Sequence, residues 1–265
     1  MVLAETGPAA SFFTIAGVRI DDLGFEGAVE AIVDHAAHGR EASYVVTPNA
    51  HHVVLFQKDA LFRRIYADAF LSVPDGVPLL WAARLLGAKP QGRVNGTDLF
   101  EAVCAEAARR GLRVFLLGGR PGAAHAAARR LRERHPALHI CGTYAPPVGF
   151  EHDSFGRTLT LERINAARPH LLFVGLGAPK QEYWMHANRH KLRVPMSLGI
   201  GVSFELVGGV VPRAPAWMQK SGLEWLFRLV SEPRRLWKRY LVGNATFLLL
   251  VARQYLRRRD YATQS

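Results

Sequence analysis

Short runs of apolar, largely β-branched residues alternate along the chain with longer segments whose apolar side chains recur at helical spacing. The short runs predict strands at residues 44–47, 71–73, 113–117, 138–141, 171–175 and 196–199. The longer segments predict helices at residues 25–37, 77–86, 99–110, 123–134, 155–167 and 182–190. A hairpin turning at Ala16-Gly17 is predicted ahead of them, over residues 12–20. This alternation is typical of an α/β fold in which helices cover both faces of a mostly parallel, Rossmann-like sheet.

The pattern changes near residues 211–215, where the sequence Val-Pro-Arg-Ala-Pro separates the sheet pattern from basic helices. We therefore predict an α/β domain over residues 1–212 and a helical appendage over residues 213–265. The appendage contains eleven lysines and arginines but only three acidic residues, Glu224, Glu232 and Asp260. It thus carries eight of the chain's twelve net positive charges.

Apolar side chains of the appendage also recur at helical spacing. One stripe contains Leu223, Leu226, Phe227 and Val230, and a second contains Leu236, Tyr240, Phe247, Val251 and Tyr255. Basic amphipathic helices rich in aromatic residues are typical of segments that lie on an anionic membrane surface. The most apolar stretch, residues 240–252, is short of the roughly 20 residues that a helix needs to cross a bilayer. We therefore expect a peripheral membrane protein without a transmembrane span.

Two alternatives explain a basic appendage without a membrane. Its helices can pack on the body with the arginines in solvent, or its surface can bind nucleic acid. The chain has no zinc-finger, RRM or KH signature, so no nucleic-acid partner is expected.

Composition sets the broad class of the protein. With 265 residues, 49% of them hydrophobic, the chain can bury one large α/β core. Its two cysteines, Cys104 and Cys141, form no CxxC motif, and residues 1–11 lack the features of a secretory signal. These observations predict a cytoplasmic location. The chain has neither an HExxH motif around His51-His52 nor an Asp-x-Asp pair at a strand end, so we expect no metal site and no cofactor.

Ligands of open parallel sheets bind where strands end and helices begin. The loop at residues 118–122 lies at such a point, and its glycines let backbone N–H groups approach an anion such as a phosphate or diphosphate. A tight structural turn is an equally good interpretation. The loop matches neither GxGxxG nor the Walker A motif, which disfavours a nicotinamide-dependent dehydrogenase.

Polar residues follow the first two predicted strands of the sheet. Asp75 lies between Pro74 and Gly76, where a carboxylate suits a general base that takes a proton from an attacking hydroxyl. An N-cap for the next helix is the alternative. Thr47 and Asn49 either orient a sugar or diphosphate or form a turn.

Arg93 precedes a predicted helix that Thr97 or Asp98 would cap. A fixed guanidinium near the crevice can offset the charge that develops on a diphosphate leaving group, and a solvated loop arginine is the alternative. Gln181 lies in the first turn of another predicted helix, where its amide can bind a polar ligand without titrating.

Four motifs occur in a fixed order along the chain. They are Asp-Gly at 75–76 with Trp-Ala-Ala-Arg at 81–84, Arg-Val-Asn-Gly-Thr-Asp-Leu at 93–99, Gly-Leu-Gly-Ala-Pro-Lys-Gln-Glu at 175–182, and Arg-Ala-Pro at 213–215. Together they resemble the WecG/TagA/CpsF family of bacterial glycosyltransferases, and the resemblance covers residues 13 to 239. Members of that family transfer a hexose-type sugar from a UDP donor to a sugar on a polyprenyl-diphosphate carrier, with inversion and without a bound metal.

The resemblance implies a role for each matching residue. Asp75 would be the catalytic base, Thr47 and Asn49 would contact the reacting sugar or diphosphate, and Arg93 and Gln181 would hold the donor or leaving group. Nucleotide and diphosphate binding is expected of Gly118, Gly119, Gly175, Gly177, Pro179, Lys180 and Glu182. Contact with the lipid diphosphate or the membrane is expected of Arg213, Arg228, Arg234, Arg235 and Arg239. The chain departs from the family pattern at His51-His52 and at Glu205, where an acid and an aspartate are frequent.

The function implied by the resemblance is sugar transfer for a surface polysaccharide or exopolysaccharide. Residues 1–212 would form the nucleotide-sugar-binding catalytic domain, and the appendage would dock on the cytoplasmic face of the bacterial inner membrane. The alternative is a non-catalytic nucleotide-binding regulatory or scaffold protein at the same surface. The residues do not determine the donor sugar, and they leave homo-oligomerisation open.

Overall fold

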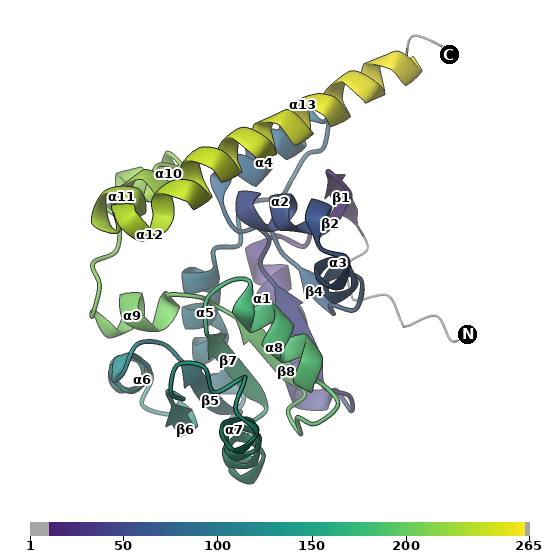
Figure 1. Ribbon diagram of the computed structural model, residues 1–265. Helices are drawn as coiled ribbons and strands as arrows, with labels where there is room; N and C mark the ends of the chain where they lie inside the picture. The colour runs from purple at the N-terminus through teal and green to yellow at the C-terminus, as the bar shows by residue number, and fades with distance from the viewer. Residues whose placement is uncertain (1–10, 263–265) are drawn as a thin grey trace.

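The structure is a computed structural model that describes residues 11–262, with the side chains of residues 220, 235, 238, 239 and 258–262 outside the description. Its centre is a parallel sheet of six strands in the order β4-β3-β8-β7-β5-β6 (Figure 1). The strands are β3 (Ser43–Val46), β4 (Leu71–Ser72), β5 (Arg113–Gly118), β6 (His139–Tyr144), β7 (Leu171–Gly175) and β8 (Met196–Gly199). The predicted α/β fold, with a mostly parallel sheet, is confirmed.

Helices pack on both faces of this sheet. One face is covered by α1 (Gly24–His38), α5 (Gly96–Arg109), α6 (Ala123–Arg134) and α9 (Ser203–Gly208). The other is covered by α2 (Ala50–Lys58), α3 (Ala60–Ala67), α4 (Val77–Leu85), α7 (Ser154–Ala167) and α8 (Lys180–Asn188). Successive strand residues point to opposite faces, so Val45 and Phe173 belong to one buried cluster and Val46 and Val174 to the other. Because both faces are buried, the strands read in sequence as continuous apolar runs.

Three helices of the body, α2, α3 and α9, have no counterpart among the predicted elements. They have nine, eight and six residues, which leaves few repeats of the helical period, although α4 and α8, of nine residues each, were predicted. Asp59 separates the first two: it ends α2, and its carboxylate accepts a hydrogen bond from Phe62 N at 2.9 Å to begin α3. The six predicted strands and six predicted helices of the body are all present, with their ends shifted by a few residues.

The predicted N-terminal hairpin is confirmed as β1 (Phe12–Ile15) paired with β2 (Val18–Asp21). Its two turn residues, Ala16 and Gly17, both have positive φ, as a type I′ turn requires. This conformation is unfavourable for alanine, and two glutamine side chains hold it. Ala16 N donates to Gln254 Oε1 at 2.7 Å, and Gln57 Nε2 donates to Ala16 O at 2.7 Å. The hairpin is thereby attached to α2 and to the C-terminal helix.

Up to residue 262, the appendage contains four α-helices, and a π-helical turn joins the third to the fourth. In order they are α10 (Ala216–Lys220), α11 (Glu224–Ser231), α12 (Pro233–Trp237), the π-turn (Lys238–Val242) and α13 (Gly243–Ala262). Helix α13 runs along one end of the body, beside α2 (Figure 1). None of the described helices is both long enough and apolar enough to span a bilayer.

The second predicted stripe of the appendage does not face lipid. Leu236, Phe247 and Val251 are each only 3% exposed, and the last two belong to the buried cluster that includes α2. The exposed apolar side chains lie at other positions of the π-turn and α13: Leu241, Val242, Leu248, Leu249 and Leu256. Helix α13 therefore has apolar side chains on two faces, and the structure shows that the stripe seen in the sequence is the face that packs on the body.

Candidate active site

A cavity of about 240 Å³ opens at the carboxyl ends of β3, β4, β7 and β8. Its wall contains the five residues predicted to act in catalysis: Thr47, Asn49, Asp75, Arg93 and Gln181. The appendage closes one side of the same cavity with Glu224, Trp225, Arg228, Tyr240 and Asn244. The site is therefore composite, and neither the sheet domain nor the appendage forms it alone.

Asp75 is positioned by the loop that follows β4. Its backbone N–H donates to Pro48 O at 2.8 Å, which ties this loop to the one after β3. Helix α4 begins with Gly76 as its N-cap and has no side-chain cap, so the alternative that Asp75 caps this helix is wrong. The aspartate instead lines the cavity.

The charge state of Asp75 is set by its surroundings. Burial raises the pKa of this carboxyl to about 6, and the Glu224 carboxylate pushes it in the same direction. The guanidinium groups of Arg93 and Arg228 and the Gly96 N–H favour the ionised form and oppose the rise. A carboxylate with a pKa just below neutrality is well matched to accepting a proton in a reaction at physiological pH.

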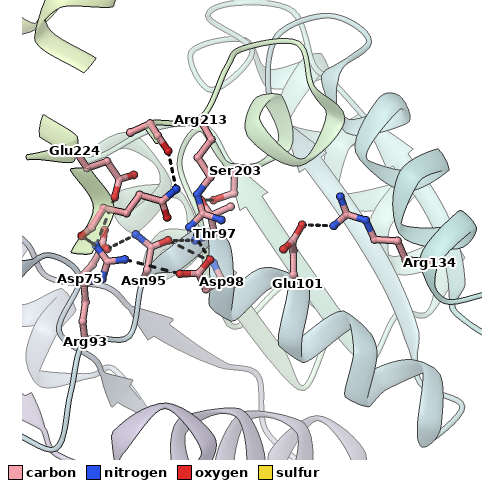
Figure 2. A network of polar contacts seen from close by, with 12 residues as sticks. Asp75, Arg93, Asn95, Thr97, Asp98, Glu101, Arg134, Ser203, Arg213 and Glu224 are labelled. Atoms are coloured by element: carbon pink, nitrogen blue, oxygen red, sulfur yellow. Dashed lines mark hydrogen bonds and ion pairs between the residues drawn. The ribbon is translucent and has the colours of Figure 1, made fainter. Parts of the chain in front are cut away.

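Asn95 connects Asp75 to the helix that follows. Its Oδ1 accepts hydrogen bonds from Thr97 N at 2.9 Å and Asp98 N at 3.3 Å, so Asn95 is the N-cap of α5. These bonds fix the amide, and its Nδ2 then donates to Asp75 Oδ1 at 3.4 Å (Figure 2). The cap was predicted at Thr97 or Asp98, and the structure corrects it to Asn95.

Arg93 lies at the junction between the body and the appendage, with its side chain 18% exposed. Its Nη1 is 3.5 Å from Glu224 Oε2 and donates to Gln219 O at 3.4 Å, while its Nη2 is 3.9 Å from Asp98 Oδ2. Figure 2 shows this guanidinium between the two carboxylates, next to Asp75. A solvated loop arginine is therefore excluded.

The other three catalytic candidates are held by hydrogen bonds within the protein. Thr47 Oγ1 donates to Gly199 O at 3.4 Å, and Asn49 caps α2 by accepting from the backbone of His51 and His52. Gln181 is 3% exposed: its Oε1 accepts from Gly201 N at 2.9 Å, and its Nε2 donates to Glu182 Oε1 at 2.8 Å. These contacts shape the cavity floor, and direct contact with a substrate stays a prediction.

Glycines 118, 119 and 175 lie outside the cavity wall. A Cβ on Gly118 would come 2.9 Å from the Gly175 carbonyl group, and one on Gly175 would come 2.7 Å from the Phe204 ring. The N–H groups of Gly119 and Arg120 already donate, to Gly175 O and Glu205 Oε1, both at 2.8 Å. Close packing between strand ends and α9 thus explains these glycines, and the structure gives no support to a phosphate cradle there.

The residues predicted from the loop after β7 separate into two groups. Gly177 lines the cavity beside Ala178, whereas Pro179, Lys180 and Glu182 do not. Lys180 Nζ lies 2.5 Å from Glu151 Oε1, and Glu182 is fully buried. The Glu182 carboxylate lies 4.0 Å from His52 Nε2, and His52 Nδ1 lies 2.8 Å from the Tyr66 hydroxyl. His52 therefore lines the cavity, and Glu182 lies behind the wall, in contact with Gln181 and near His52.

The appendage arginines also have different environments. Arg228 lines the cavity, and Arg234 is exposed. Arg213 Nη2 lies 2.5 Å from Asp98 Oδ1, so this guanidinium pairs with α5, and its contact with a lipid diphosphate stays a prediction. The side chains of Arg235 and Arg239 lie outside the described residues.

The ion pairs between acids of the appendage and arginines of the body were not predicted from the sequence. Two of the three acids in the basic appendage contact arginines of the body: Glu224 contacts Arg93, and Glu232 Oε1 lies 2.6 Å from Arg120 Nη2. Isolated acids within a strongly basic segment were the sequence feature that could have indicated such ion pairs. Trp225, Tyr240 and Asn244 had no comparable signal, because their place in the wall depends on the fold of the appendage.

Comparison with known proteins agrees with this geometry. Residues 13–261 match the model of the "Glycosyl transferase WecG/TagA/CpsF family". A curated relative from Bacillus subtilis (strain 168), N-acetylglucosaminyldiphosphoundecaprenol N-acetyl-beta-D-mannosaminyltransferase, is 30% identical over 213 residues, 80% of each chain. A protein of the same name from Bacillus spizizenii is 29% identical over 201 residues, 76% of each chain. The match spans both the sheet domain and the appendage, and the chain therefore belongs to the WecG/TagA/CpsF family of glycosyltransferases.

Proposed function

We propose that this glycosyltransferase moves a sugar from a UDP donor to a sugar carried on a polyprenyl diphosphate, with inversion at the anomeric carbon. The observation that carries the proposal is the placement of one carboxyl of raised pKa, Asp75, beside two arginines in a single cavity. The names of the relatives describe such a lipid-linked acceptor and a β-linked transferred sugar.

The chemistry follows from these groups. The acceptor hydroxyl oxygen forms a bond to the anomeric carbon of the donor, and the bond from that carbon to the β-phosphate oxygen of UDP breaks. Asp75 takes the hydroxyl proton as the oxygen attacks. Arg93 and Arg228 offset the negative charge that develops on the departing diphosphate.

The appendage brings this site to its lipid-linked acceptor. The exposed apolar side chains of the π-turn and α13, with Arg234 and other cations, suit the headgroup layer of an anionic membrane. The cavity borders this segment through Tyr240 and Asn244, so a lipid surface docked on the segment would lie close to the cavity. Binding at the cytoplasmic face of the inner membrane, in synthesis of a cell-envelope polysaccharide, is the setting we propose.

A transfer assay tests the proposal. The full chain is incubated with UDP-N-acetylmannosamine, its uronic acid and UDP-glucose in turn, together with a short-chain prenyl-diphosphate-linked N-acetylglucosamine. We expect one donor to give a lipid-linked disaccharide whose new linkage, by NMR, is inverted relative to the donor. Nucleotide binding without transfer across the panel would favour the regulatory or scaffold function instead.

The raised pKa of Asp75 predicts how activity depends on pH. Because the base must be ionised, kcat/KM should fall as the pH drops through about 6, the pKa of Asp75 in the free enzyme. Glu224 raises this pKa, so Glu224→Gln should move the acid limb of the profile to lower pH. Steady-state profiles of the two proteins measure the shift.

Glu232→Gln is the matched control for that experiment. Glu232 is an acid of the same appendage that also pairs with a body arginine, but it does not line the cavity. The acid limb of the Glu232→Gln pH profile should coincide with that of the wild type. Coincident limbs in wild type and Glu224→Gln would show that Asp75 is not the group that titrates.

A further inference from the structure

The outward face of α4 is formed by Trp81, Arg84 and Leu85, with Lys89 in the loop just beyond. Trp81 is 54% and Leu85 is 55% exposed, although both are large apolar side chains one helical turn apart. Trp81 and Arg84 belong to a motif that identifies the family, yet neither lines the cavity. The proposed reaction therefore leaves this face unexplained.

Helix α4 begins at the cavity and lies against the appendage. Its first two residues, Val77 and Pro78, are part of the cavity wall. Gly222, in the link between α10 and α11, packs so closely on α4 that a Cβ there would lie 2.9 Å from Val77 Cβ and 3.4 Å from Trp81 Cη2. Trp81 is thus one helical turn from the cavity wall, and α4 lies at the end of the molecule where α10 to α13 gather (Figure 1).

The chemistry of this face matches a lipid headgroup layer. Tryptophan is enriched at membrane interfaces, where its ring meets the acyl boundary and its N–H stays hydrated. Arg84 and Lys89 are exposed cations of this face, and the segment 77–96 contains no aspartate or glutamate. An exposed indole ring beside a leucine and two cations is complementary to an anionic bilayer.

We infer that the outward face of α4 is a second lipid contact, which acts together with the exposed face of the π-turn and α13. The inference rests on the proposed function, because it requires an acceptor held in a membrane. A single docked helix leaves the body able to roll about the helix axis. A second contact, one turn from the cavity, fixes the orientation and directs the cavity mouth toward the headgroup layer, where the diphosphate of the acceptor lies.

Vesicle binding by the full chain tests the inference. The double variant Trp81→Ala/Leu85→Ala is compared with wild type by co-sedimentation with phosphatidylglycerol–phosphatidylcholine vesicles. Loss of two buried apolar contacts should weaken binding by about tenfold. Phe155→Ala is the matched control, because Phe155 is 72% exposed on α7, at the opposite end of the body (Figure 1), and its removal should leave binding unchanged.

A second pair of measurements separates this inference from the proposed function. The double variant should keep wild-type transfer to a water-soluble short-chain acceptor and lose transfer to a long-chain acceptor in vesicles. If wild type binds vesicles and the double variant binds equally well, the α4 contact is wrong while the proposed function stands. If sedimentation equilibrium shows a wild-type dimer that the double variant disrupts, the face is a contact between two copies of the chain and the inference is overturned. If wild type transfers no sugar to either acceptor, the proposed function itself has failed.

Discussion

Replacing Asp75 with asparagine is expected to lower kcat for sugar transfer by about 10²- to 10⁴-fold, the range that a positioned general base contributes. Asparagine has nearly the same shape and can still accept the hydrogen bond from Asn95 Nδ2, but it cannot take a proton from the attacking hydroxyl. Steady-state transfer to a short-chain acceptor measures the loss. Binding of UDP, followed by calorimetry, should be retained.

Thermal unfolding distinguishes this catalytic effect from a folding defect. Since the folded-state pKa of Asp75 is raised from 3.8 to about 6, ionisation of the carboxyl lowers stability as the pH rises through that window. Above pH 6 the wild type carries this cost and the asparagine variant does not. The variant should therefore melt no lower than wild type at neutral pH. A folded variant with undiminished transfer would remove Asp75 from the role of base.

Replacing Arg93 with alanine is expected to lower kcat by about 10²- to 10³-fold, the cost of removing one group that stabilises developing charge in the transition state. The 18% exposure of the guanidinium makes its charge more effective than that of an arginine in solvent. Arg93→Lys should restore only part of the activity. The planar guanidinium of arginine can contact Glu224, the Gln219 carbonyl and a diphosphate at the same time, and the compact ammonium of lysine cannot. Arg93 also lowers the pKa of Asp75, so the acid limb of the alanine variant should move to higher pH.

Arg120→Ala is the control for the structural part of this effect. Arg120 resembles Arg93 in joining the body to an appendage acid, Glu232, but it lies outside the cavity wall. If Arg93 served only to hold the appendage in place, the two alanine variants would lose activity equally and share one pH profile. We expect transfer by Arg120→Ala to stay close to wild type.

The predicted fold and the predicted site depended on different kinds of signal. Strands β5, β7 and β8 were located closely, because a strand buried on both faces is a continuous apolar run between loops. The catalytic candidates were located by strand ends and by motif order, and the cavity gathers all five of them. Glycines 118, 119 and 175 show the limit of this approach, because in sequence a glycine at a strand end is equally compatible with close packing and with phosphate binding, and only the structure shows the close packing.

The sequence by itself determined the α/β class, the strand positions, the basic character of the appendage and the family motifs, because these depend on local pattern and residue type. Only the tertiary structure decided which face of α13 packs on the body, that Glu224 reaches Arg93, and that Asn95 joins Asp75 to α5. Glu224 and Arg93 are 131 residues apart, and no local pattern encodes a contact over that separation. The raised pKa of Asp75 has the same origin: it arises from burial and from charges that folding brings together.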